Sequence, residues 1–201
     1  MRRPQLKGKS VRRICCKRNG YVLRPGDSTG EIRRKYNLEQ FTGRVWALGD
    51  DIDTDIIIPT EYLALKTIED MKQYGFSPLR PELAAQIKEG DIIVAGKNFG
   101  CGSSREQAPE VIKALGIRCI LAKSFARIFF RNSINNGLLL IEQPDLYDDI
   151  AEGDSITVTV NQDVDYKGKK YPIASLPDNL VEIINAGGLV KAMRKRNGLD
   201  C

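Results

Sequence analysis

A short loop rich in glycine and serine, FGCGSSRE, contains the side chains of this 201-residue chain with the clearest capacity for chemistry. Gly100 and Gly102 allow a tight turn and let a ligand approach the backbone closely. Ser103 and Ser104 add two hydroxyl groups, and Arg105 can hold a carboxylate through two parallel hydrogen bonds. Apolar runs on both sides predict that the loop joins a strand to a helix, where backbone N–H groups and the helix dipole favour an anion.

The same residues also fit a purely structural role at the start of a helix. The pairs Ser103/Glu106 and Ser104/Gln107 both have the spacing of a capping box, in which each side chain bonds to the backbone N–H of the other residue. Pro109 suits the first turn of the helix that follows. By itself, the loop is therefore equally consistent with a helix cap and with an anion-binding site.

A second candidate is an acidic segment in which Asp51, Asp53 and Asp55 alternate with other residues, as they do in calcium-binding loops. An EF-hand loop that began at Asp51 would need glycine and glutamate at the positions occupied by Ile56 and Tyr62. The calcium hypothesis therefore fails. We expect a turn rich in aspartate whose carboxylates shape the loop by bonding to nearby backbone groups.

A third segment, KSFARIFFRNS (residues 123–133), has the apolar spacing of a helix face that packs on a core. Its aromatic residues therefore favour core packing over a cofactor pocket. Arg127 and Arg131 are four residues apart and share one face of the predicted helix. The residues alone leave open whether these two cations are solvated or face an acidic partner surface.

The chain contains no histidine. This excludes Ser–His and Cys–His nucleophilic pairs and every histidine-based metal site, so a catalytic role would require essential groups from another chain. The five cysteines form no C-x-x-C pair and have no disulfide-like spacing; they are Cys15, Cys16, Cys101, Cys119 and Cys201. This pattern predicts a reducing compartment, and we expect the protein to be cytoplasmic.

Charge divides the chain into two regions. Residues 1–40 contain 12 of the 31 Lys and Arg residues but only three of the 26 acidic residues, so the remainder has a small acidic excess. We expect residues 1–40 to be a flexible basic arm and residues 41–201 to form the folded domain. An organellar targeting presequence is the alternative for the arm. Nucleic-acid binding by the folded region is not expected, and no apolar run is long enough to cross a membrane.

Hydrophobic periodicity from Gly43 onward predicts an α/β fold. Short apolar runs alternate with helical spacing between Asp91 and Ile141, giving a β-α-β-α-β segment that is typical of a parallel sheet. The other predicted elements are a strand at 44–48, a helical stretch at 61–74, a hairpin that pairs 156–160 with 171–173, and helices at 180–186 and 189–196.

Three segments, in a fixed order and spacing, resemble one protein family closely. They are GDDIDTDIIIP (49–59), NFGCGSSRE (98–106) and SFARIFFRNS (124–133). They resemble the swivelling domain of aconitase-like proteins, especially the separate small subunits of isopropylmalate dehydratases, from about Thr42 to about Arg196. The resemblance implies a domain of β/β/α layers that closes over a large partner subunit. It also implies that the partner carries a [4Fe-4S] cluster and that this chain binds no metal.

The resemblance further implies roles for individual residues. Ser103 would be the base that removes a proton from the substrate carbon, and Ser104 and Arg105 would bind a substrate carboxylate. The segment Tyr62-Leu63-Ala64-Leu65 would be the substrate-recognition loop. Relatives that handle an extra carboxylate tend to have arginine at its third position, where this chain has Ala64. An apolar loop favours an isopropyl or methyl group, because it cannot pair a further carboxylate.

The implied activity is a hydro-lyase reaction of leucine biosynthesis that interconverts 2-isopropylmalate and 3-isopropylmalate by dehydration and rehydration. The dicarboxylate would bind between this chain and the large subunit. Citramalate, dimethylmalate and homoaconitate are the alternative substrates. An alternative from another class is a non-catalytic regulator that binds RNA or a partner through residues 1–40. Gln107 departs from the family pattern, since many relatives have histidine there, and we expect this departure to leave activity intact.

Overall fold

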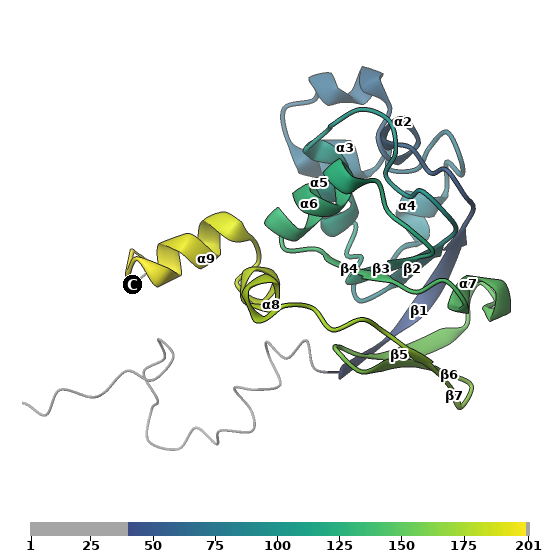
Figure 1. Ribbon diagram of the computed structural model, residues 1–201. Helices are drawn as coiled ribbons and strands as arrows, with labels where there is room; N and C mark the ends of the chain where they lie inside the picture. The colour runs from purple at the N-terminus through teal and green to yellow at the C-terminus, as the bar shows by residue number, and fades with distance from the viewer. Residues whose placement is uncertain (1–39, 200–201) are drawn as a thin grey trace, which may run out of the picture.

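The computed structural model describes residues 40–199, in which seven strands form one mixed sheet in the order β4-β3-β2-β1-β5-β6-β7 (Figure 1). The strands are β1 (Gln40–Leu48), β2 (Ile92–Ala95), β3 (Cys119–Ala122), β4 (Leu139–Glu142), β5 (Ser155–Thr159), β6 (Asp163–Tyr166) and β7 (Lys169–Pro172). Every residue of β2 and β3 is buried, as expected for central parallel strands covered on both faces.

β1 belongs to both halves of the sheet. Its last four residues, Val45–Leu48, pair in parallel with β2, and its first five, Gln40–Arg44, pair antiparallel with β5. The parallel half continues from β2 to β3 and β4, and the antiparallel half continues from β5 to β6 and β7. The sheet curls at β1, so the antiparallel strands lie below the parallel ones in Figure 1.

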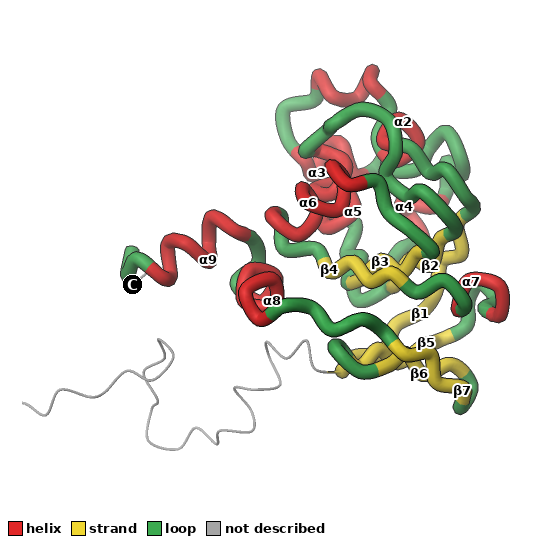
Figure 2. The backbone as a smooth tube through the Cα atoms, in the orientation of Figure 1, coloured by secondary structure: helices red, strands yellow, loops and turns green. Residues whose placement is uncertain are grey.

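Nine helical segments occur in the described part of the chain, and five of them have only four or five residues. They are α2 (Thr54–Ile57), the 3₁₀ helix η1 (Thr60–Ala64), α3 (Ile68–Lys72), α4 (Leu83–Gln86), α5 (Gln107–Ala114), α6 (Arg127–Asn135), α7 (Leu146–Asp149), α8 (Asp178–Asn185) and α9 (Leu189–Arg196). Figure 2 shows a loop that leads from β7 to α8, and α8 and α9 extend to one side of the layered body. None of the helices between residues 40 and 199 has the length and apolar character needed to cross a membrane.

Two apolar cores cover the two faces of the parallel strands. Because neighbouring side chains on a strand point to opposite faces, Trp46 packs in the core beneath α5 and α6, while Val45 packs against the antiparallel strands. Cys119 and Val164, from the two halves of the sheet, meet in the second core. The β/β/α layering that the family resemblance implies is therefore confirmed.

Two predicted elements differ from those observed. The helical stretch predicted at 61–74 is divided into η1 and α3, because Leu65 and Thr67 have extended backbones and Thr67 caps α3. The predicted hairpin is instead a three-stranded meander, in which β6 lies between β5 and β7. The prediction missed β6 because it contains Asp163 and Asp165, whose side chains flank the buried Val164. The predicted basic arm lies outside the described residues, except Gln40, which begins β1.

Candidate active site

The glycine–serine loop follows β2 at the carboxyl end of the parallel strands, the edge at which open α/β sheets bind ligands. The acidic segment lies beside it, since the N–H of Gly100 donates to the carbonyl of Ile52 at 2.7 Å and the N–H of Thr54 donates to the carbonyl of Cys101 at 2.9 Å. The third segment pairs with the loop at Phe99. All three segments singled out in the sequence therefore meet at one place.

The loop is close to the third segment at Gly100, which has a φ of 78°. A Cβ atom at this position would lie 2.1 Å from the ring of Phe129 in α6, so no other residue fits without displacing the ring. Gly102 also has a positive φ, 88°, but its nearest neighbour would be the hydroxyl of Thr54 at 3.3 Å. Gly100 thus allows close packing, whereas Gly102 mainly supplies a left-handed turn.

Both serines of the loop are exposed. The hydroxyl of the buried Thr54 donates to the backbone carbonyl of Ser103 at 3.0 Å and holds this part of the loop in place. The capping-box interpretation is wrong for both serines, because α5 starts at Gln107 and its N-cap, Glu106, makes no capping hydrogen bond. Within residues 40–199, neither serine hydroxyl has a hydrogen-bond partner, so both are available to a ligand.

Arg105 is held by the segment that contains the acidic residues. Its guanidinium lies 2.7 Å from the carboxylate of Asp55 and donates to the hydroxyl of Thr60 at 2.9 Å and to the carbonyl of Ile58 at 3.1 Å. The Thr60 hydroxyl also donates to Asp55. The Arg105 side chain is 14% exposed. Three protein groups thus accept from the Arg105 guanidinium, and its remaining N–H groups are available to a ligand.

A pocket of about 310 Å³ opens in front of the loop, and we call it the catalytic pocket. Its lining joins the glycine–serine loop to the first turns of α6: Thr54, Gly100, Gly102, Ser103, Ser104, Arg105, Ala126, Arg127, Ile128, Phe129 and Asn132. The helix expected from the sequence to face the loop was α5, but the lining contains no residue of α5. The first turn of α6 takes that position.

Arg127 is the charged residue of this pocket whose role the sequence left open. It is exposed at the first position of α6 and has no hydrogen bond or ion pair with another described residue. The signal that could have found it is topological, because the connections after β2 and β3 both leave the sheet at its carboxyl edge. Arg131, one turn later, is exposed but is absent from the lining.

The predicted substrate-recognition loop lies near the catalytic pocket without lining it. Tyr62 stacks on Tyr74 with ring centroids 3.8 Å apart, and Leu63 and Leu65 pack against the first core. Ala64 is exposed. The link to the pocket runs through η1, whose first residue bonds to Arg105. None of the four residues from 62 to 65 lines the catalytic pocket.

The acidic segment bonds chiefly to neighbouring backbone and amide groups. Asp53 caps α2 by accepting from the N–H of Ile56 at 2.7 Å, and Asp51 accepts from the side-chain amide of Asn98 at 2.8 Å. Burial, followed by the charges of Asp53 and Asp51, raises the pKa of the Cys101 thiol above its usual value. Among residues 40–199, no group of three His, Cys, Asp or Glu side chains could hold a metal ion.

Comparison with known proteins gives consistent matches. Residues 52–146 match the family model of the aconitase C-terminal domain. The chain is 80% identical over 162 residues to the 3-isopropylmalate dehydratase small subunit of Lachnospira eligens, covering 81% of this chain and 99% of that protein. It is 51% identical over 160 residues to small subunit 1 of Archaeoglobus fulgidus, covering 77% and 99%. The crystal structure of 3-isopropylmalate dehydratase from Methanocaldococcus jannaschii matches with a TM-score of 0.75 and 40% identity, covering 80% of this chain and 96% of that one.

Proposed function

Because this chain belongs to the family of 3-isopropylmalate dehydratase small subunits, hydro-lyases related to aconitase, we propose that it provides the proton-transfer half of an active site shared with a large subunit. The substrate is 2-isopropylmalate, which is converted to 3-isopropylmalate in leucine biosynthesis. The observation that carries this proposal is the exposed Ser103 hydroxyl, which has no hydrogen-bond partner among residues 40–199, in a pocket that also contains Ser104, Arg105 and Arg127.

The large subunit would complete the site with a [4Fe-4S] cluster, which when bound supplies the Lewis acid that holds the substrate hydroxyl and one carboxylate. The described residues of this chain contain no cluster-type ligand set, which fits a cluster held by the partner. We place the enzyme in the cytoplasm. The alternative of an organellar presequence depends on residues outside the described ones.

Ser103 acts as the base in this mechanism. Its Oγ, as the alkoxide, takes the proton from the substrate carbon, the hydroxide leaves from the neighbouring carbon, and an alkene diacid results. The isomer forms when a hydroxyl adds to the carbon that lost the proton and a proton adds to the carbon that lost the hydroxide. A serine alkoxide is too basic to form unaided, so positive groups must stabilise it. The pocket offers the cation of Arg127 and the N-terminal turn of α6 for this purpose.

The substrate carboxylates bind to the cationic and hydroxyl groups of the same pocket. Ser104 donates a hydrogen bond, and Arg105 uses the N–H groups that Asp55, Thr60 and Ile58 leave free. Arg127 provides a second cation, which a dicarboxylate requires. The substrate-recognition loop has no charged side chain that could pair a further carboxylate, which favours isopropylmalate over homoaconitate. We prefer isopropylmalate to citramalate and dimethylmalate because the relatives are named for it.

Replacement of Ser103 tests the proposal. In the complex with the large subunit, Ser103→Ala should lower kcat for 2-isopropylmalate by about 10²-fold or more, the usual contribution of a general base. Ser104→Ala is the matched variant, since it removes an equally exposed hydroxyl, and it should mainly raise KM. Circular dichroism and co-purification confirm that each variant folds and binds the large subunit. A kcat within twofold of wild type for Ser103→Ala would eliminate Ser103 as the base.

The substrate choice is tested separately with a panel of 2-hydroxy diacids. We expect the highest kcat/KM for isopropylmalate, and a higher value for a methyl-substituted malate would reverse the assignment. A non-catalytic regulator that binds RNA or a partner through residues 1–40 predicts that deletion of these residues abolishes this binding and leaves turnover unchanged. It also predicts that Ser103→Ala has no effect on turnover.

A further inference from the structure

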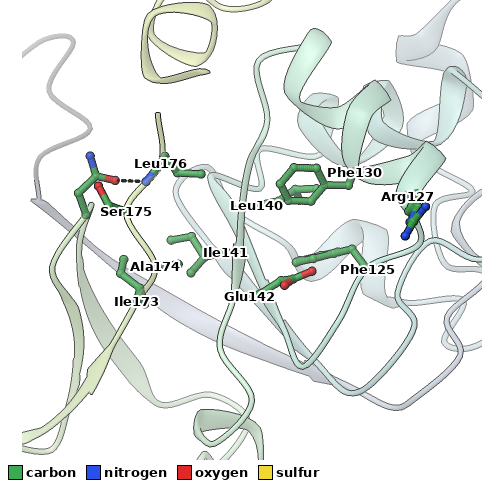
Figure 3. Close-up of a pocket in the computed structure, with 11 residues that line it drawn as sticks. Phe125, Arg127, Phe130, Leu140, Ile141, Glu142, Ile173, Ala174, Ser175 and Leu176 are labelled. Carbon is green, nitrogen blue, oxygen red and sulfur yellow. Dashed lines mark hydrogen bonds between the residues drawn. The ribbon is translucent and has the colours of Figure 1, made fainter. Parts of the chain in front are cut away.

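A second pocket, of about 320 Å³, lies between the carboxyl end of β4, α6 and the segment 173–176 that leads from β7 to α8 (Figure 3). Apolar side chains form its walls: Phe125, Phe130, Leu140, Ile141, Ile173, Ala174 and Leu176. In Figure 3 the segment 173–176 lies on one side of the hollow, and Phe125 and Glu142 lie across from it. Its volume is at the lower end of the range for small-molecule sites.

The second pocket is separate from the catalytic pocket but adjoins it. Arg127 is the single residue that lines both. Phe125 forms part of the wall between them, because its ring contacts Phe130 on one side, at 5.9 Å between centroids, and the edge of Phe99 in the catalytic loop, at 6.2 Å. A ligand in the second pocket therefore contacts residues that support the catalytic loop without occupying the place of the substrate.

The polar groups of the second pocket carry opposite charges. Arg127 and Glu142 are both exposed, and neither forms an ion pair with the other or with any other residue from 40 to 199. On the opposite side, the amide oxygen of Asn161 accepts from the N–H of Leu176 at 2.8 Å, which leaves the amide N–H groups to donate. The hydroxyl of Ser175 is also exposed. The cavity thus combines aliphatic and aromatic walls with one cation and one anion.

We propose that the second pocket binds a free α-amino acid with a branched aliphatic side chain. Such a ligand places its carboxylate on Arg127, its ammonium group on Glu142 and its side chain against the apolar walls, so each charge gains a partner as it leaves water. A simple carboxylate would leave Glu142 unpaired, and a simple amine would leave Arg127 unpaired. An apolar side chain inserted by a partner protein would leave both charges unpaired.

Occupation of the pocket has a consequence for catalysis, and this part rests on the proposed function. A ligand carboxylate on Arg127 draws that cation away from the catalytic pocket, where it is needed by the substrate dicarboxylate. The amino acid should therefore raise KM for isopropylmalate, and it should also lower kcat, because Arg127 helps to stabilise the Ser103 alkoxide. By linkage, the substrate should weaken amino-acid binding by the same factor.

Calorimetry on the full-length chain, alone and in complex with the large subunit, tests binding without turnover. L-leucine should bind, and 4-methylpentanoate and 3-methylbutylamine, which each lack one charge, should bind about tenfold more weakly or worse. Ser175→Trp fills the pocket and should abolish binding. Asn179→Trp adds the same ring at an exposed residue outside the lining and should not.

The binding result decides the proposal independently of Ser103. Equal affinity for leucine and its two analogues, or unchanged affinity in Ser175→Trp, would overturn it. Binding to the chain alone that disappears in the complex would also overturn it, because the partner would then cover the pocket. The kinetic arm follows in the intact enzyme, where leucine should raise KM at least threefold in wild type and not in Ser175→Trp. Binding without this change in KM would refute the regulatory consequence.

Discussion

The guanidinium of Arg105 lies 2.7 Å from the carboxylate of Asp55, and this ion pair joins the glycine–serine loop to the acidic segment. The same guanidinium bonds to Thr60 and to the carbonyl of Ile58. The residue expected from the sequence to hold a substrate therefore also holds the loop to η1. It can do both, since a guanidinium has five N–H donors in a fixed plane.

Arg105 should contribute more to the stability of the fold than its acidic partner Asp55. Asp55 is half-exposed, so Asp55→Asn should lower the free energy of unfolding by no more than about 1 kcal/mol. Arg105→Met should cost about 1–3 kcal/mol, because the Ile58 carbonyl and the Thr60 hydroxyl lose the donor that Arg105 provides and Asp55 loses its ion pair. Urea unfolding of both variants measures the difference, and equal losses would show that the ion pair alone holds the loop.

The two glycines of the loop should respond differently to alanine. Gly100→Ala places a methyl group 2.1 Å from the Phe129 ring and requires a positive φ, so we expect a loss of at least about 2–3 kcal/mol in the free energy of unfolding. Gly102→Ala meets only the Thr54 hydroxyl at 3.3 Å, and the positive φ alone should cost about 1–2 kcal/mol. Thermal unfolding of the two variants compares the effects, and a larger loss for Gly102→Ala would contradict the geometry.

The buried thiol of Cys119 should make the fold less stable at alkaline pH. Burial raises its pKa far above the ordinary value of 9.0. Above that value the unfolded chain loses the proton while the folded chain keeps it, so stability that is fully present below pH 9.0 falls as pH rises. The slope is up to about 1.4 kcal/mol per pH unit. Cys119→Ala should remove this contribution. Urea unfolding under reducing conditions between about pH 8 and 11 would show parallel curves for the two proteins if the thiol played no part.

A charged residue at Ala64 should change the substrate preference. Ala64 is exposed in η1, so Ala64→Arg can be accommodated and offers a partner for a further carboxylate. The ratio of kcat/KM for homoaconitate to that for isopropylmalate should rise by about tenfold or more, the value of one charged hydrogen bond. Ala64→Met, which adds a side chain without charge, is the control. An equal change in both variants would mean that size, and not charge, sets the preference.

Much of the fold follows from local sequence. β3 lies within the predicted β-α-β-α-β segment, and its continuous apolar run Cys119–Ala122 is typical of a buried parallel strand. The division between η1 and α3 also had a local signal that was missed, since Thr67 and Asp70 have the spacing of a helix cap and do bond to each other. β6 gave no such signal, because its two aspartates mask the alternation of Val164 and Tyr166.

The site was less predictable, because its composition depends on contacts between distant segments. The loop itself could be found from Gly100 to Arg105, but local spacing could not decide between a helix cap and an anion site. The start of α5 at Gln107 excludes the helix cap, and anion binding by the loop is part of the proposed function. The approach of α6 to the loop rests on the pairing of Phe99 with Phe125. Arg127 therefore lines the catalytic pocket because of tertiary contacts, which hydrophobic periodicity cannot predict.

The position of β1 in both halves of the sheet also determines when folding can finish. Thr42 and Thr157, which bond through their hydroxyls across β1 and β5, are 115 residues apart in the chain. During synthesis on the ribosome, the antiparallel edge of β1 therefore stays unpaired until β5 and most of the chain have been made. Such long-range pairing slows folding and exposes an edge strand to aggregation, so synthesis rate and chaperone supply should limit the yield of this subunit.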